Sequence, residues 1–146
     1  MAGYSGRTLT QKLGLKPHMK AMWLDAPDGH LDWLPDLQEI TEITEITAGS
    51  EGTSPLDFIH LYVTRKQILQ EKLPELRTLL NPAGMIWVSW PKKASQVPTD
   101  VTEDTIRDLA LSLDLVDVKV CAVSEVWSGL KLVIPKASRA RAVQML

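Results

Sequence analysis

The chain has 146 residues, of which 45% are hydrophobic and 23% charged, a length and composition typical of one globular domain with a single core. Its formal net charge is -2, so no overall field attracts it to nucleic acid or to an anionic membrane, and we expect neither partner. A single cysteine, Cys121, excludes an internal disulfide and a cysteine-based zinc site.

The first part of the chain predicts a helix, a strand and a turn. Residues 8–13 place two leucines at helical spacing and precede a glycine suited to end a helix. Residues 20–24 form a short apolar run of the kind that buried strands have. Residues 25–29 (DAPDG) have turn composition, whereas the Glu-Ile-Thr repeat in 39–47 predicts a weak strand.

The middle of the chain predicts a strand, a helix and a second strand. Residues 56–63 (LDFIHLYV) are almost continuously apolar, as expected of a parallel strand covered on both faces. The leucine spacing that follows predicts a helix, with Thr64 as its N-cap and with a kink or a new start at Pro74. Residues 81–84 (NPAG) predict a turn into a buried strand over 85–90.

The last third predicts a helix and a hairpin. Thr102 is a suitable N-cap, and apolar residues follow it at helical spacing. Residues 116–123 and 130–134 are apolar strands joined by a short link, so they should pair as an antiparallel hairpin. Strand and helix alternate before this hairpin, which predicts a three-layer α/β fold with a mostly parallel, twisted sheet. We expect one domain over residues 1–136 and a flexible tail over 137–146.

Two segments link this order of elements to a known fold. The segment LGLKPHMKAMWLDAPDG is similar to the first motif of the class I S-adenosylmethionine-dependent methyltransferase fold, and LLNPAGMIWVSW resembles its fifth-strand segment. The resemblance implies a shortened version of that fold. Four blocks, GYSGRTLTQKLGLKP, VSWPKKAS, TEDTIRDLAL and LVDVKVCAVSEVWSGLKLV, also resemble a family of small bacterial proteins catalogued only as a domain of unknown function.

The segment that would bind the cofactor departs from the methyltransferase pattern. That turn usually supplies an acidic residue and three closely spaced glycines, whose backbone amides face the carboxylate of the cofactor. Here the acidic position falls on Trp23, and the glycine positions fall on Asp25, Pro27 and Gly29. Asp25 adds a negative charge and Pro27 removes an amide donor. We therefore expect a degenerate cofactor turn and no resident cofactor, with S-adenosylmethionine as the alternative.

The segment after the predicted strand 85–90 is the main candidate ligand site. It follows the carboxyl end of a central strand, where open α/β sheets bind ligands. Its candidate residues are Trp90, Lys92, Lys93 and Ser95. The two lysines could hold an anion while Trp90 stacks on it, and the alternative is a solvated basic loop with Trp90 packed as a lid.

Further residues have both a functional and a structural interpretation. Tyr4 and Arg7 could fold over the same sheet edge, or could belong to a poorly ordered terminus. Four oxygen-bearing residues near the last helix could be ligands or a general base, or could cap the helix. They are Thr99, Asp100, Thr102 and Glu103. Trp127, beside the hairpin turn, is a candidate for the edge of a pocket, and His60 is interpreted as a hydrogen-bonded core residue.

These patterns favour a methyltransferase-like domain that is not an enzyme and that binds a small anionic ligand or a protein partner, for example a second copy, at the carboxyl edge of its sheet. The alternative is an active methyltransferase that uses S-adenosylmethionine. Nucleic-acid contact through Trp90 and the two lysines is a third hypothesis, against which the net charge counts. The first residues lack the apolar segment of a secretory signal, so we expect a cytoplasmic protein without a metal site.

Overall fold

The computed structural model of the chain describes residues 8–35, 37, 44–45 and 55–139. Within these ranges lies a sheet of six strands in the order β2-β1-β3-β4-β6-β5. The strands are β1 (Lys20–Leu24), β2 (Thr44–Glu45), β3 (Leu56–Tyr62), β4 (Leu80–Pro91), β5 (Val116–Ala122) and β6 (Trp127–Val133). Strands β1 to β4 are parallel, and β6 is antiparallel to both of its neighbours. The mostly parallel sheet with a closing antiparallel hairpin is therefore confirmed.

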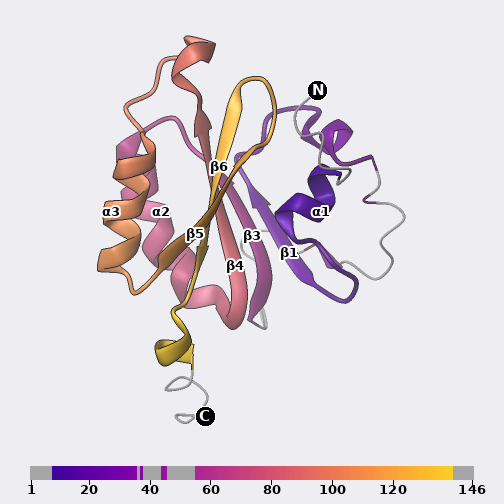
Figure 1. Cartoon of the computed structure of the whole chain (residues 1–146), viewed down its shortest axis with the longest axis vertical. Coiled ribbons are helices and arrows are strands. Elements are labelled where there is room, and N and C mark those ends of the chain that lie inside the picture. The colour runs from indigo at the N-terminus through magenta and orange to yellow at the C-terminus, as the bar shows by residue number, and fades with distance from the viewer. Residues whose placement is uncertain (1–7, 36, 38–43, 46–54, 140–146) are drawn as a thin grey trace.

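Helices cover both faces of this sheet. The long helices α2 (Lys66–Leu79) and α3 (Glu103–Ser112) lie together on one face. The short helix α1 (Leu9–Leu13) and the turn η1 (His30–Trp33) lie on the other (Figure 1). The order of layers is therefore helix, sheet, helix, as the alternation of strands and helices predicted.

Each face of the sheet has its own hydrophobic core, because successive strand residues point to opposite sides. On β3, Ile59 and Leu61 pack towards α2 and α3, whereas Phe58 packs towards α1. Trp87 of β4 is the largest fully buried side chain of the described residues, and its Nε1–H donates to the carbonyl oxygen of Leu13 at 2.8 Å. This bond fixes the carboxyl end of α1 to the sheet.

The helix ends show which polar residues have structural roles. Thr102 caps α3 through a capping box with Thr105, as predicted. The expectation that Thr64 caps α2 is wrong: the N-cap is Arg65, and the backbone N–H of Lys66 instead donates to Asp100 Oδ1 at 2.6 Å. The carbonyl of Thr64 accepts hydrogen bonds from the segment that carries Asp100. A carboxylate distant in the sequence thus replaces a local cap.

The capping role of Asp100 gives a direct prediction. Substitution Asp100→Ala leaves the Lys66 N–H without its acceptor, so we expect the free energy of unfolding to fall by about 1 kcal/mol. Urea denaturation measures this change, and Asp108→Ala, at an exposed carboxylate on α3, is the control. Equal stability of the two variants would contradict the capping role.

In the middle of the chain, two predicted features differ from the structure. Residues 81–84 were expected to form a turn before the strand, but β4 already begins at Leu80 and contains an irregular pairing with β3 there. The side-chain amide of Asn81 donates to Asp57 Oδ1 at 3.1 Å, and this contact holds the irregular segment against β3. Helix α2 continues through Pro74 without a second start.

Parts of three predictions lie outside the described residues. Of the weak strand expected over 39–47, the structure describes Thr44–Glu45 as β2, paired with β1. Of the tail expected over 137–146, it describes residues 137–139, in which Ser138 is buried. Residues 1–7, with the candidates Tyr4 and Arg7, are not described.

Candidate functional site

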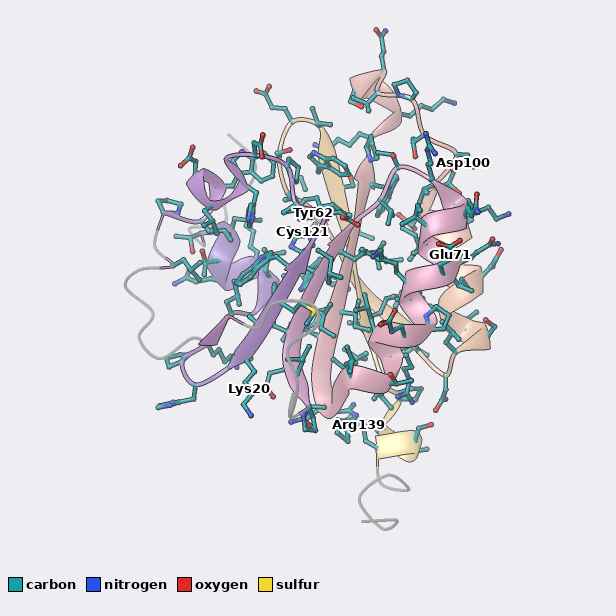
Figure 2. The ribbon with its side chains drawn as sticks, turned by 180° about the vertical axis from the view of Figure 1, so that it is seen from behind. Lys20, Tyr62, Glu71, Asp100, Cys121 and Arg139 are labelled. Carbon is teal, nitrogen blue, oxygen red and sulfur yellow. The ribbon has the colours of Figure 1, made fainter. Side chains whose placement is uncertain are left out.

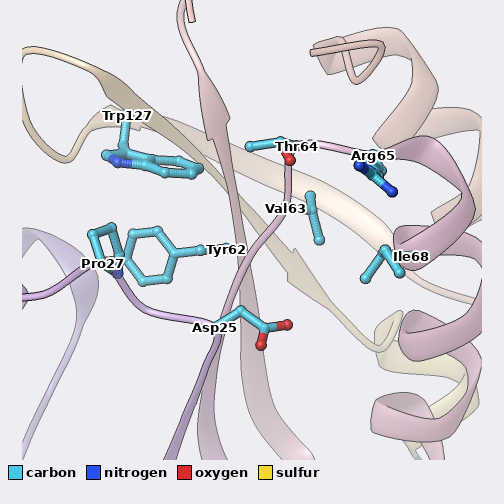
Figure 3. Close-up of a pocket in the computed structure, with 8 residues that line it drawn as sticks. All are labelled: Asp25, Pro27, Tyr62, Val63, Thr64, Arg65, Ile68 and Trp127. Carbon is cyan, nitrogen blue, oxygen red and sulfur yellow. The ribbon is translucent and has the colours of Figure 1, made fainter. Parts of the chain in front are cut away.

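A pocket of about 490 Å³ opens at the carboxyl ends of β1 and β3. Strand β2 pairs with one side of β1 and β3 with the other. The strand order therefore reverses at β1: the chain first adds β2 on one side and then continues with β3 on the opposite side. In open α/β sheets, ligands bind at such a reversal. The pocket is lined by Asp25, Pro27, Tyr62, Val63, Thr64, Arg65, Ile68 and Trp127 (Figure 3).

Two aromatic rings form one wall of this pocket. The rings of Tyr62 at the end of β3 and Trp127 at the start of β6 meet edge to face, with centroids 5.1 Å apart. Figure 3 shows Pro27 beside the Tyr62 ring and Trp127 on the same side of the pocket. Tyr62 is 4% exposed and His60 stacks on its ring, whereas Trp127 is half-buried, so Trp127 supplies the flat apolar surface on which a planar ligand can stack.

The charged side chains of the pocket lie away from this wall. Arg65 precedes the first turn of α2, and Asp25 follows β1, with both side chains exposed. Figure 3 shows Asp25 below the aromatic wall and Arg65 beside α2. The guanidinium lies at the amino end of a helix, which carries a partial positive charge. The Arg65 end of the pocket is thus the end that favours an anion.

The floor behind Tyr62 is a buried aromatic cluster rather than a catalytic dyad. His60 stacks on Tyr62 with ring centroids 4.3 Å apart, and its Nε2 lies 2.7 Å from Ser89 Oγ. Burial, followed by repulsion from His30, lowers the pKa of His60 to about 3. Burial also raises the pKa of the Tyr62 hydroxyl. Because His60 is neutral and 1% exposed, its interpretation as a hydrogen-bonded core residue is confirmed.

The predicted cofactor turn contributes to the pocket in part. Asp25 and Pro27 line it, whereas Gly29 precedes η1 in the left-handed conformation, with φ 78°. Asp25 also has a left-handed φ of 55°, a conformation that usually favours glycine. The ring of Trp23 packs 5.6 Å from that of Phe58 on the α1 face. The turn thus keeps one backbone feature of a glycine position but carries a carboxylate there.

The predicted ligand residues at the end of β4 and just after it do not line the pocket. Trp90 is 8% exposed and packs in the core beneath α2 and α3. Lys93 and Ser95 lie in the short turn η3 (Lys93–Ser95), at the top of Figure 1. The Ser95 hydroxyl donates to the carbonyl of Lys92 at 2.6 Å, which stabilises that turn. Anion binding by Lys92 and Lys93 stays a prediction.

The four oxygen-bearing residues near α3 have structural roles. Thr99 Oγ1 donates to the Thr64 carbonyl, and Glu103 pairs with Arg107 on the outer face of α3. Asp100 lies beside the amino end of α2, at a distance from Tyr62 (Figure 2). Among the described residues, no group of three or more His, Cys, Asp or Glu side chains could hold a metal ion. The capping interpretation is therefore confirmed for Thr102, whereas Asp100 caps α2 and the other two residues make different structural contacts.

Five pocket residues were not predicted as site residues, among them Tyr62 and Arg65, which have the most distinctive chemistry. Tyr62 looked like one more apolar residue of a buried strand, and Arg65 like a solvated residue before a helix. Trp127 was predicted at a pocket edge, where the structure has it. For Tyr62 and Arg65, the feature of the sequence that could have indicated a site was their position at the end of a central parallel strand.

Comparison with solved structures identifies the architecture. An S-adenosylmethionine-dependent methyltransferase from Aquifex aeolicus matches 86% of this chain and 87% of its own, with a TM-score of 0.61 and 15% identity. The chain has a methyltransferase-like fold. Magnesium protoporphyrin IX methyltransferase from Synechocystis, with bound S-adenosylhomocysteine, matches 86% and 78%, with a TM-score of 0.56 and 10% identity. At such identities the likeness concerns the methyltransferase-like fold alone.

Sequence comparisons add no family. No family model matches the chain, so the narrower resemblance to a bacterial family stays a prediction. No curated protein matches it either. In the part of the chain that the structure describes, no helix has the length and apolar character that crossing a bilayer requires.

Proposed function

We propose that this methyltransferase-like domain binds a small anionic ligand with a planar ring in the pocket at the carboxyl edge of its sheet, without catalysing a reaction on it. The observation that carries the proposal is the pairing of an aromatic wall with a cation in one pocket, Tyr62 and Trp127 on one side and Arg65 on another. A ring that stacks on the wall would place its anionic group within reach of the guanidinium. Nucleoside monophosphates have this chemistry.

The volume and position of the pocket support this proposal. About 490 Å³ lies within the range of small-molecule sites, and the location is the one that open α/β sheets use. The nearby imidazole of His60 is buried beneath Tyr62, neutral and outside the pocket lining, so it is poorly placed to act as a general base there. Binding therefore explains the pocket better than catalysis does.

The residues of the turn after β1 do not fit the usual cradle for S-adenosylmethionine. A cradle needs backbone N–H groups close to the cofactor carboxylate, and Pro27 has none to offer. Asp25, which also lines the pocket, would repel that carboxylate. The rival function, an active methyltransferase, rests on the fold, and it requires Asp25 and Pro27 to be compatible with the cofactor.

A binding assay with three proteins tests the proposal. Isothermal titration of the wild type with the four common nucleoside monophosphates should give saturable binding of at least one. Arg65→Gln should weaken this binding by about tenfold or more, because a charge-assisted contact is lost. Lys93→Gln is the matched control, since it removes an exposed cation at the same sheet edge but outside the pocket.

The opposite results would contradict the proposal. If none of the nucleotides binds, or if Lys93→Gln weakens binding while Arg65→Gln does not, the pocket is not the anion site. If S-adenosylhomocysteine binds more tightly than every nucleotide, the rival methyltransferase function is favoured instead.

A further inference from the structure

A second basic site lies on the α1 face of the sheet, apart from the pocket. Lys119 of β5 and Lys131 of β6 are directly paired in the antiparallel register, so their side chains leave the same face side by side. Both are half-buried, and neither lines the pocket. We call these two residues and Lys16, which follows α1, the lysine cluster.

The role of Lys119 has a structural explanation. Its Nζ donates to the carbonyl oxygen of Lys12 at 3.0 Å, in the last turn of α1. Carbonyls in the last turn of a helix lack partners inside the helix, and a cation beside them is favourable. Lys119 therefore helps to hold α1 on the sheet, together with the indole of Trp87.

Lys131 has no such explanation. Within the part of the chain that the structure describes, Lys131 forms no ion pair and no side-chain hydrogen bond. Burial lowers the pKa of Lys131, and the charges of Lys119 and Lys16 lower it further. The charges of Lys119 and Lys16 that act on Lys131 are thus both positive, and among the described residues no carboxylate forms an ion pair with it.

The repulsion between these lysines destabilises the fold unless an anion lies between them. Like charges placed directly opposite each other in a sheet destabilise it, and a half-buried ammonium loses part of its hydration. An anion between the ammonium groups would offset both costs.

We propose that the lysine cluster binds a small oxyanion, namely a phosphate group, either as inorganic phosphate or as the phosphoryl group of a small metabolite. A compact, multiply charged oxyanion matches ammonium groups, which act as point charges. The net charge of -2 disfavours a long polyanion such as nucleic acid. This site is independent of the pocket and of its proposed ligand.

Thermal unfolding of the full chain tests the proposal. A few millimolar phosphate, compared with chloride at equal ionic strength, should raise the melting temperature of the wild type, because a ligand of the folded state stabilises it. Lys131→Gln should lose at least about tenfold in apparent phosphate affinity. It should also be at least as stable as the wild type in chloride alone, because the repulsion is relieved.

Two control variants and a second ligand distinguish binding at the lysine cluster from a general effect of phosphate and from binding in the pocket. Lys72→Gln removes a half-buried lysine of α2 outside both sites and should respond to phosphate as the wild type does, which also corrects for the general stabilising effect of phosphate. Arg65→Gln should keep the response, which distinguishes this site from the pocket. Glycerol phosphate binding more tightly than inorganic phosphate would identify a metabolite as the source.

Two results would overturn the proposal. One is an equal phosphate response of Lys131→Gln and Lys72→Gln. The other is binding of a short oligonucleotide, with steep salt dependence, in place of phosphate.

Discussion

Replacing Trp87 with alanine will lower the free energy of unfolding by about 3–5 kcal/mol. Trp87 is fully buried in the core under α1, so the truncation leaves a large cavity. It also removes the donor to the Leu13 carbonyl, which fixes α1 to the sheet. Because small domains are stable by only about 5–15 kcal/mol, the variant should unfold at a much lower urea concentration than the wild type.

Trp87→Phe separates the two parts of this effect. It keeps most of the ring volume but removes the indole N–H, and so leaves the Leu13 carbonyl without that donor. We expect a loss of about 1–2 kcal/mol, clearly less than for alanine. Equal urea midpoints for the wild type and Trp87→Ala would show that this side chain does not organise the core.

Acidification from pH 7 to pH 4 will destabilise the protein through His60, by about 3 kcal/mol. The pKa of this buried imidazole is about 3 when folded, against 6.5 as the ordinary value. Between these values the unfolded chain binds a proton that the folded chain does not, so stability falls as the pH falls through this window. Urea denaturation at pH 7 and at pH 4 measures the loss.

His60→Gln is the matched variant, because glutamine keeps a polar group for Ser89 Oγ but does not titrate. Carboxylates contribute to acid destabilisation in both proteins, so the difference between the two losses isolates His60. We expect the variant to lose about 3 kcal/mol less than the wild type over the same pH range. Equal losses would contradict the prediction, because they would mean that folding does not lower the pKa of His60. His60→Phe provides a second test should the glutamine variant fold poorly.

The strands were predictable because their hydrophobic patterns are local. The apolar run of 56–63 and the hairpin over 116–134 required no knowledge of the rest of the chain. Contacts between distant segments escaped the prediction. The cap of α2 comes from Asp100, far along the sequence, and no local signal at Thr64 announces it.

The candidate site was predictable only in part, for the same reason. Trp90 and Tyr62 both end central strands, and their sequence contexts look alike. In the fold, Trp90 packs in the core that α2 and α3 share with the sheet. Tyr62 instead lines a pocket together with Trp127, which lies at the start of the antiparallel strand β6 beside β4. Which strand end stays open depends on strand order, which composition and periodicity do not determine.

The most direct test of the pocket uses its own tryptophan as a reporter. Of the five tryptophans in the chain, only Trp127 lines the pocket, so its indole N–H signal in a ¹⁵N-labelled sample reports occupancy. Nucleoside monophosphates should shift this signal to saturation in the wild type and only weakly in Arg65→Gln, while S-adenosylhomocysteine should leave it unchanged. A saturable shift with S-adenosylhomocysteine and none with the nucleotides would contradict the proposed function.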